Sequence, residues 1–402
     1  MRVLVHDMQG YVFVRDLAAG LAGHGHEVAF VTCPSVASPH QRSGKYAPGV
    51  QTVEVRLASE FAKYDLRRRL QSERQYGRRV SDVIARIQPD IVLSSNAPLL
   101  SQHLVARAAH RTGARFVFWL QDLYGAVARQ ALAERLPDRL AQAAAAPFAA
   151  LERRLLVTSD HVVTVGRCLA RAALEAGVGT ARHELIPNWM DPSSVAYFPT
   201  PDTGWRQRHY PGVGTLLLYS GTLGKKHPYM RLSQAAGCLP DGAHLAVVSE
   251  GLGAGWLREH QARLPVSVLG YQPEHVVPEM LGSADILVLM LSDEACRYSV
   301  PSKLYTYLCA GRPILALVPP WSESADFVRD QGVGLVVDVN RPDSLRQAIE
   351  TLSGDGDLRR RMGTAARTWA EANMDPEVIA DAFDAVLQRT MSATRTPVRA
   401  RS

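Results

Sequence analysis

Short apolar runs alternate with amphipathic helical patterns along this chain, and the alternation constrains the fold more than any other feature. In the first half, each apolar run is only a few residues long and most are followed by a stretch with helical spacing. Strands that alternate with helices form parallel sheets with helices on both faces. We predict strands at 2–6, 27–32, 51–56, 91–94, 115–120, 161–165 and 185–187, and helices at 12–23, 68–87, 100–112 and 137–159.

The same pattern restarts after residue 213, so the chain has two α/β halves. A length of 402 residues suits two domains. Between the halves, 189–205 holds three prolines and little periodicity, which is typical of a linker. We predict further strands at 214–219, 243–248, 266–269, 286–291, 314–318 and 334–337, and helices at 229–237, 302–310, 342–352, 357–371 and 376–390.

These patterns predict an N-terminal domain over 1–188, the linker, and a C-terminal domain over 206–375. We expect the helix at 376–391 to pack back on the N-terminal domain, and the basic tail 392–402 to be disordered. Two such halves place a ligand cleft between them, because open parallel sheets bind ligands at the carboxyl ends of their strands.

Charge and cysteine content limit the class of partner. Lys and Arg number 45 against 39 Asp and Glu, and a net charge of +6 suits an anionic small ligand or an anionic membrane surface. No pattern supports nucleic-acid binding. The five cysteines lack zinc or C-x-x-C spacing, and no apolar run approaches the roughly 20 residues of a membrane span. We therefore expect a cytoplasmic protein that touches a membrane only from its surface.

A glycine- and lysine-containing loop follows the strand at 214–219. Gly221 and Gly224 would let backbone N–H groups approach a phosphate, and Lys225 or Lys226 would add a full positive charge. The alternative is a plain turn between strand and helix with solvated lysines. The loop is neither a Walker loop nor a dinucleotide fingerprint.

A second candidate anion site precedes the helix at 302–310. Ser299 is placed to cap this helix, and Pro301 suits its first turn. Lys303 also lies in the first turn, where the helix dipole disfavours a cation, so it indicates a negatively charged partner. The alternative is a tolerated exposed lysine.

Three further strand ends carry polar or glycine residues. The stretch 247–254 is a strand that runs into a Gly-rich loop, which would let a flat base lie against the backbone. Gln121, Asp122 and Tyr124 follow the strand at 115–120; Asp122 alternatively caps the next helix. After the first strand, Gly10 permits close approach of a substrate. His6 and Asp7 could contact the acceptor, although we favour for His6 a buried ring hydrogen-bonded to backbone.

Taken together, these features resemble family 4 glycosyltransferases with the GT-B fold, which is an α/β fold of two Rossmann-like domains facing a cleft. The likeness covers about residues 1–375. The stretches 119–122 and 300–303 look like the bacterial O-antigen and capsular polysaccharide subgroup. The other markers are the loop at Gly10 and the segments 25–28, 186–188, 220–226, 271–273, 284–285 and 301–313.

The resemblance implies that the C-terminal domain binds a nucleotide diphosphate sugar and the N-terminal domain binds the acceptor, with retention at the anomeric carbon and without a metal. Lys226 matches the phosphate-binding lysine, with Lys225 beside it, and Asp122 is our third catalytic candidate. The predicted substrate-binding residues are Gly10, Gln121, Tyr124, Gly221, Thr222, Ser249, Glu250, Gly251, Tyr271, Gln272, Tyr298, Ser299, Val300, Pro301, Ser302, Lys303 and Thr306.

The chain departs from the family at several of these places. Tyr298 and Thr306 stand where the family commonly has two Glu, Thr222 stands where it often has Arg, and Gln121 where it commonly has His. Asp293 and Glu294 are nearby candidates to replace the carboxylates. The only Asp-x-Asp, at 355–357, opens a late helix, so we interpret it as a turn and helix cap and predict no metal site.

The expected activity is transfer of a hexosyl group, which could be an N-acetylated amino sugar, from a UDP-linked donor. The acceptor would be a saccharide or a polyprenyl-diphosphate-linked sugar in surface polysaccharide assembly. Arginines 67, 68, 69, 74, 78 and 79 alternate with apolar residues over 64–80, which suits either an anionic lipid surface or a solvated helix face. A nucleotide-sugar epimerase of the same fold and a non-catalytic sugar-binding subunit are the alternatives.

Overall fold

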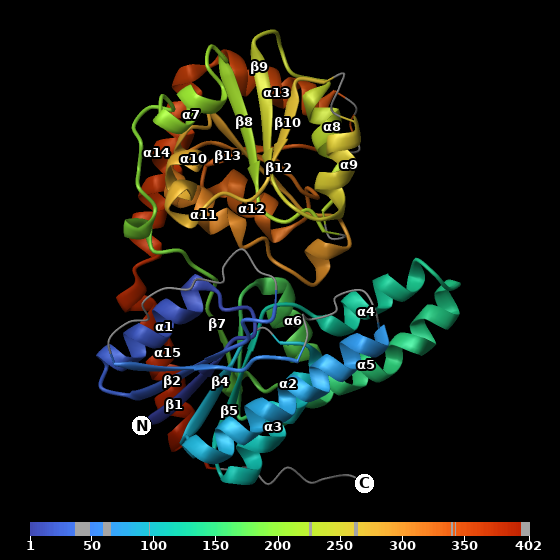
Figure 1. Ribbon diagram of the computed structural model, residues 1–402, viewed down its shortest axis with the longest axis vertical. Helices are drawn as coiled ribbons and strands as arrows, with labels where there is room; N and C mark the ends of the chain where they lie inside the picture. Colours follow the sequence, from blue (N-terminus) through green and yellow to red (C-terminus); the bar gives the residue numbers. More distant parts are fainter. Residues whose placement is uncertain are drawn as a thin grey trace. The chain divides into compact units, whose positions relative to one another are not determined.

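The computed structural model describes residues 1–36, 49–58, 66–95, 97–224, 227–260, 264–338, 341 and 343–394. Within these ranges the side chains of residues 66 and 67 are excluded. The chain forms two compact units, one of Met1–Pro187 with Pro376–Ser402 and one of Asn188–Asp375. We call them unit 1 and unit 2 and describe each by itself (Figure 1).

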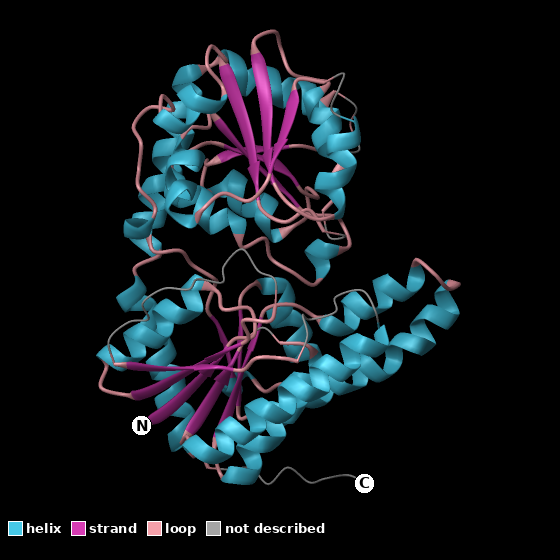
Figure 2. Cartoon of the chain, viewed as in Figure 1, coloured by secondary structure: helices cyan, strands magenta, loops and turns pink. Residues whose placement is uncertain are grey.

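Unit 1 is built on a parallel sheet in the order β3-β2-β1-β4-β5-β6-β7. Its central strands are buried on both faces, which explains their continuous apolar sequences. Helices cover the sheet (Figure 2). The strands are β1 (Arg2–His6), β2 (Glu27–Thr32), β3 (Val50–Glu54), β4 (Ile91–Ser94), β5 (Arg115–Leu120), β6 (His161–Thr164) and β7 (His183–Leu185).

Most helices of unit 1 connect consecutive strands, and the last one returns from the end of the chain. That last helix packs against α1 and β5. His26, which follows the end of α1, has its Nε2 2.7 Å from Oδ1 of Asp384 on this helix. The helices are α1 (Val12–Gly23), α2 (Leu66–Ile87), α3 (Leu99–Thr112), α4 (Tyr124–Ala133), α5 (Asp138–Thr158), α6 (Arg167–Ala176) and α15 (Pro376–Ser392).

Unit 2 repeats the plan with a parallel sheet in the order β10-β9-β8-β11-β12-β13. A core of Leu, Val, Ile and Ala side chains from the sheet and its helices fills the interior. The strands are β8 (Thr215–Ser220), β9 (Ala243–Val248), β10 (Val266–Leu269), β11 (Ile286–Met290), β12 (Ile314–Leu317) and β13 (Gly334–Val336).

The helices of unit 2 include several short ones near the strand ends. They are α7 (Gly204–His209), α8 (Met230–Ala236), α9 (Leu252–His260), α10 (Val277–Gly282), α11 (Lys303–Ala310), α12 (Glu323–Asp330), α13 (Ser344–Gly354) and α14 (Gly356–Asn373). Asp355 is the N-cap of α14 and accepts a hydrogen bond from Leu358 N at 2.8 Å. The interpretation of 355–357 as a turn and helix cap is therefore confirmed.

In both units the strand order reverses direction beside the first strand. β1 lies between β2 and β4, and β8 lies between β9 and β11. Such switch points leave a crevice at the carboxyl ends of the strands, where ligands bind in open α/β sheets. The candidate ligand-binding edges are therefore formed by the loops after β1 and β4 in unit 1 and the loops after β8 and β11 in unit 2.

The sequence predictions missed several helices. The stretch 247–254 was predicted as a strand that runs into a Gly-rich loop; the strand is confirmed, but the loop ends early because α9 begins at Leu252. A Cβ at Gly253 would lie 2.7 Å from the Tyr229 ring, so this glycine serves close helix packing. Helix α7 overlaps the predicted linker, since Thr203 accepts a hydrogen bond from Arg206 N and caps it. α4, α6, α10 and α12 were also not predicted.

Candidate active site

The loop after β8 is the centre of the candidate donor site in unit 2. Gly221 has φ +123°, a conformation that favours glycine. Its amide donates to Val248 O at 2.9 Å, so it is committed to the neighbouring strand rather than presented to a phosphate. A Cβ at this position would lie 2.1 Å from Lys303 Cε. The glycine therefore provides room for a lysine, and its own N–H is not one of the backbone groups that could approach a phosphate.

Lys303 is the first residue of α11 and reaches back over the loop after β8. Its ammonium lies 5.1 Å from the centre of the Tyr219 ring. Burial lowers the pKa of this group to about 8. No carboxylate in the described part of the chain forms an ion pair with it. A desolvated cation at a helix start without a carboxylate partner is a site prepared for an anion.

Two loops beside Gly221 complete the edge of the sheet. Leu223 N donates to Glu250 O at 3.1 Å, and Gly251, at φ +105°, passes so close that a Cβ there would lie 3.0 Å from Leu223 O. Thr222 Oγ1 lies 2.6 Å from the Tyr271 hydroxyl, and burial raises the pKa of that tyrosine. The structure thus brings together residues from three strand ends that the sequence marked separately.

The remaining predicted residues of this edge differ in their exposure. Ser249 is buried, Glu250 is exposed and lies 3.6 Å from Arg258, and Gln272 donates to Gly270 O at 3.1 Å. Tyr298 is buried at 4 % exposure, and Ser302 is exposed. Ser299, Val300, Pro301 and Thr306 are half-buried.

The predicted cap of α11 is wrong. The N-cap position is Ser302, its side chain makes no capping hydrogen bond, and the helix begins at Lys303. The reason is local: Ser302 is already in the helical region of backbone angles, whereas a capping side chain needs an extended residue before the first turn. Ser299, the residue predicted to cap, lies three residues before this N-cap position.

Lys225 and Lys226 lie outside the described residues. Two residues that the sequence analysis did not select adjoin this loop. Arg231 has a buried Nη1 without a hydrogen-bond partner among the described residues, and its Nη2 lies 3.7 Å from Asp293. Tyr307 lies one turn after Lys303, and its hydroxyl accepts from Ser220 N at 3.0 Å. The i, i+4 spacing from Lys303 is a signal that could have found Tyr307.

In unit 1 the edge at β1 and β4 holds a closed network of side chains. His6 is fully buried, with Nδ1 2.7 Å from Ser94 Oγ and Nε2 2.9 Å from the Tyr76 hydroxyl. Ser94 in turn donates to Gln102 Oε1. Burial lowers the pKa of His6 to about 3, so the ring is neutral. The burial of His6 is as we favoured, but its partners are side chains and not backbone.

Beside this network lie the predicted acceptor residues. Gly10 has φ +70°, and a Cβ there would lie 3.0 Å from Thr32 Oγ1. Gln121, Asp122 and Tyr124 are half-buried at the start of α4. Burial raises the pKa of the Tyr124 hydroxyl, and the charge of Asp122 adds to this shift.

The N-terminus of α4 is held by a carboxylate that the sequence did not reveal. The N-cap position of α4 is Leu123, one residue after Asp122, and the Leu123 side chain makes no capping hydrogen bond. Instead, Glu152 on α5 accepts from Gly125 N, with both oxygens at 3.3 Å. Burial raises the pKa of Glu152 to about 7. Gly125 is required here because a Cβ would lie 2.9 Å from Glu152 Oε2.

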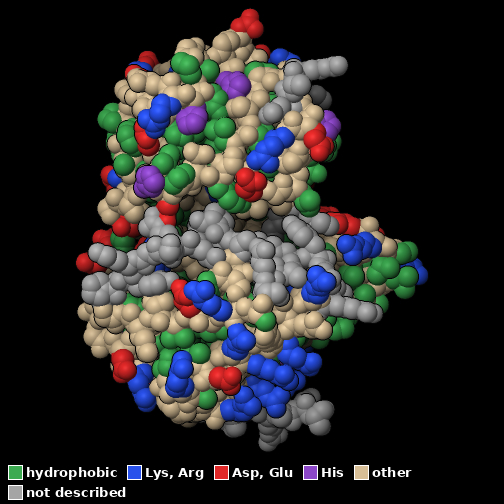
Figure 3. Space-filling view, viewed as in Figure 1, with side chains coloured by type: hydrophobic (Ala, Val, Ile, Leu, Met, Phe, Trp, Pro, Cys, Tyr) green, Lys and Arg blue, Asp and Glu red, His purple; other side chains and the backbone are tan. Residues whose placement is uncertain are grey.

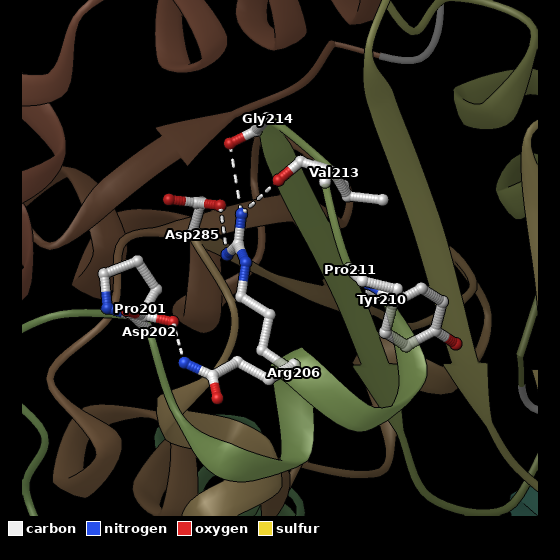
Figure 4. A pocket seen from close by; sticks show the side chains of 10 residues that line it. Pro201, Asp202, Arg206, Tyr210, Pro211, Val213, Gly214 and Asp285 are labelled. Atoms are coloured by element: carbon white, nitrogen blue, oxygen red, sulfur yellow. Dashed lines mark hydrogen bonds and ion pairs between the residues drawn. The ribbon is translucent and has the colours of Figure 1, made fainter.

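A cavity of about 290 Å³ in unit 2 lies at the opposite, amino end of β8 (Figure 4). Arg206 at its centre pairs with Asp285 at 2.7 Å and donates to the carbonyls of Val213 and Gly214. The hydrogen-bonding groups of the Arg206 guanidinium are therefore used within the fold. Arg206 holds α7 against the sheet, so we assign the cavity a structural role. Within the described ranges, no group of three or more His, Cys, Asp or Glu side chains is arranged to hold a metal ion.

Comparisons with known proteins agree with this division of the chain. Residues 11–189 match the model of the glycosyl transferase 4-like domain, and residues 210–369 match that of glycosyl transferases group 1. The chain is 21% identical over 324 residues to the probable glycosyltransferase WbjE of Pseudomonas aeruginosa, covering 76% of each chain.

Two solved structures are similar over nearly their whole length. Sucrose-phosphate synthase from Thermosynechococcus elongatus has a TM-score of 0.76 at 17% identity, covering 98% of this chain and 100% of that one. HepE from Anabaena, in complex with UDP-glucose, has a TM-score of 0.71 at 14% identity, covering 96% of this chain and 99% of that one. With both family models matched in order, the chain belongs to the family 4 glycosyltransferases of the GT-B fold and uses a nucleotide sugar.

Proposed function

We propose that the chain transfers a hexosyl group from a UDP-linked sugar, with retention of configuration and without a metal, to an acceptor in surface polysaccharide assembly. The acceptor is a saccharide or a polyprenyl-diphosphate-linked sugar. One observation carries the donor side of the proposal: the Lys303 ammonium is desolvated over Gly221 and lacks a carboxylate partner in the described structure. The UDP-glucose complex of HepE supports UDP as the nucleotide.

The chemistry needs a positive charge where the leaving diphosphate develops negative charge. Lys303 supplies it from a half-buried position, where electrostatic stabilisation is stronger than in water. Arg231, in the first turn of α8, is a second cation, and one of its buried nitrogens has no hydrogen-bond partner among the described residues. We assign Lys225 and Lys226 to the same diphosphate. Four cations then perform the role that a divalent metal fills in other transferases.

Base and ribose lie, in this proposal, against the loops after β9 and β10. Gly251 allows close approach of a flat ring to the backbone, and the Tyr271 ring offers a partly exposed aromatic face. Tyr298 is buried, so it cannot play the part of an exposed glutamate, while Thr306 retains a hydroxyl at a half-buried position. Asp293 is 3.7 Å from Arg231, which makes it a partner of that cation.

On the acceptor side we assign Gln121, Asp122 and Tyr124 to binding, with Asp122 orienting the acceptor hydroxyl. The bond from the anomeric carbon to the diphosphate oxygen breaks as the acceptor oxygen bonds to that carbon. The hydroxyl proton passes to the departing diphosphate, so atoms and charge balance without a second carboxylate. Gly10, with its positive φ and no side chain, allows the sugar ring to approach the backbone after β1.

Surface association with an anionic membrane belongs to the proposal because a lipid-linked acceptor is presented there. Arg68, Arg74, Arg78 and Arg79 are exposed on α2. Tyr76 and Val80 of the same helix are completely buried in unit 1, so α2 itself can contribute charge but little apolar contact. No helix in the part of the chain that the structure describes is long and apolar enough to cross a bilayer.

Calorimetry with UDP tests the donor site. Wild type should bind UDP without added metal and with EDTA present, and Lys303→Met should weaken binding by about 100-fold, the scale of one strong charge-assisted contact. Arg346→Met, which removes an exposed cation from α13, is the matched control and should bind normally. Binding by Lys303→Met equal to wild type would refute the assignment.

Product analysis separates the proposal from its alternatives. Proton NMR of the first product should show the anomeric configuration of the donor. Epimerised sugar from donor incubated alone would indicate an epimerase. UDP binding without turnover across a panel of saccharide and lipid-linked acceptors would indicate a non-catalytic subunit.

A further inference from the structure

The helical hairpin of α4 and α5 projects from the sheet of unit 1 (Figure 1). Leu140–Leu151 of α5 is a run of twelve residues without a charged side chain. Within it only Ala141 and Ala145 are buried, while most of the other residues are exposed to solvent. Exposed helix faces normally carry charged residues, so this face is unusual for a surface that meets only water.

The apolar character increases toward the tip of the hairpin. Leu140 is 58% exposed and Leu136 is 36% exposed, and both are large aliphatic side chains. Ala143, Ala144 and Pro147 continue the exposed apolar face along α5. Hydrophobic side chains cover much of this hairpin in the space-filling view (Figure 3).

Arginines surround this face. Arg129, Arg135 and Arg139 belong to the hairpin and are exposed, and none of the three pairs with a carboxylate in the described parts of the chain. Arg153 and Arg154 are exposed just after the uncharged run. Long cationic side chains beside an apolar face can extend to phosphate groups while the apolar face enters the acyl boundary.

The basic face of α2 is close to the hairpin. α5 packs on α4 and α3, and α3 packs on α2, so these helices form one layer. On the face of unit 1 seen in Figure 3, Lys and Arg side chains gather over α2 and α3 while the hydrophobic hairpin lies on the same visible side. A flat anionic surface can therefore meet both.

We propose that the α4–α5 hairpin is a membrane-docking element that enters the headgroup region of an anionic phospholipid bilayer with its uncharged face and binds phosphate with its arginines. The proposal extends the proposed function, since it specifies how unit 1 reaches a lipid-linked acceptor, but the binding itself requires no donor and no turnover. Alanine contributes little apolar area, so binding must depend on anionic lipid as well as on Leu136 and Leu140.

Sedimentation with vesicles tests the proposal on the full chain. Wild type should bind phosphatidylglycerol-containing vesicles, bind pure phosphatidylcholine vesicles at least about tenfold more weakly, and lose binding as salt is raised. Leu140→Glu should weaken binding by about tenfold or more. Val378→Glu, at a residue of α15 with 61% exposure, is the matched control and should bind as wild type.

Arginine variants and oligomeric state complete the test. Arg135→Ala and Arg139→Ala should each lower vesicle affinity by about fivefold, the effect of one surface arginine. UDP calorimetry on Leu140→Glu should match wild type, which shows that the variant is folded and keeps failure here distinct from failure of the donor site. If wild type does not sediment with anionic vesicles, the proposal is overturned. A wild-type dimer that Leu140→Glu dissociates also overturns it, because a second copy would then cover this face.

Discussion

The carboxyl edge of the sheet in unit 1 and that in unit 2 have the same strand order around them but differ in how their polar groups are satisfied. At β1 and β4, both nitrogens of His6 have side-chain partners, and Ser94 and Gln102 extend the network. At β8 and β11, Lys303 has a glycine beneath it and no carboxylate partner among the described residues. The His6 network is hydrogen-bonded within itself, although the neighbouring Ser95 Oγ is buried without a hydrogen-bond partner among the described residues. The half-buried Lys303 ammonium has an aromatic neighbour but no counter-ion there, so an anion can bind it.

This difference separates the two kinds of variant that follow. Changes at the unit 2 edge should alter UDP binding, because the Lys303 charge has no carboxylate partner among the described residues. Changes beside the unit 1 edge should alter transfer while leaving UDP binding intact. A unit 1 variant that weakens UDP binding would show that the two edges do not act on separate substrates.

Asp122→Asn should have the largest effect on transfer. We expect the rate to fall by about 100-fold or more, the scale of losing one acid–base or orienting group in a transition state. UDP affinity measured by calorimetry should stay within about twofold of wild type. Asp82→Asn, at an exposed carboxylate on α2, is the control. A parallel loss of UDP affinity in Asp122→Asn would contradict the division between the two edges.

Gly221→Ala should weaken UDP binding by about tenfold. Its φ of +123° disfavours any other residue, and the added methyl would displace the Lys303 side chain. The free energy of unfolding should fall by about 1–3 kcal/mol as well. Gly354→Ala, at the end of α13, is the matched variant, because a Cβ at Gly354 meets no atom within 4 Å. Equal UDP affinity in both variants would show that the close approach of Lys303 to Gly221 is incidental.

The pH dependence of UDP binding tests whether the positive charge of Lys303 binds the diphosphate. Burial lowers the pKa of Lys303 to about 8, and an anion binds only the protonated form well. UDP affinity should therefore fall as pH rises through about 8, by up to about tenfold per pH unit. Lys303→Arg should bind with little change over pH 7 to 9.5, since arginine stays charged. A slope that persists in the arginine variant would assign the titration to another group.

Much of the fold could be predicted from the sequence because buried parallel strands have continuous apolar runs. β1, α1 and β2 begin and end where the pattern placed them. α4 escaped prediction because its Ala-rich sequence has almost no polar face to define a period, and α9 because Gly253 was taken for a loop residue. Both helices depend on tertiary neighbours that a local pattern does not contain.

For the candidate site, the sequence identified the segments but not their chemistry. Gly221 and Lys303 were selected from separate motifs, but only the structure shows that the glycine makes room for the lysine. Glu152 was not selected at all, because its partner amides belong to residues about 27 positions earlier in the chain. A single sequence contains no local pattern that identifies contacts between distant segments.

Glu152→Gln should affect transfer least, within about twofold, because the glutamine still accepts a hydrogen bond from the start of α4. The main effect of this substitution is on the free energy of unfolding.

Burial raises the pKa of Glu152 from 4.5 to about 7 in the folded chain. Between these two pH values the folded state therefore binds a proton that the unfolded state does not. The stabilisation is complete below about pH 4.5 and is lost as pH rises through 7.

Denaturant unfolding at pH 4.5, 6 and 8 measures this contribution. Wild type should lose up to about 3 kcal/mol across this range from Glu152 alone, and Glu152→Gln should lack that share of the slope. Glu175→Gln, at an exposed carboxylate on α6, should retain it. If Glu152→Gln keeps the full slope, the buried carboxyl is not the titrating group. If it also weakens UDP binding, then a group that supports only the acceptor edge has acted on the donor edge, and the two regions are coupled rather than separate.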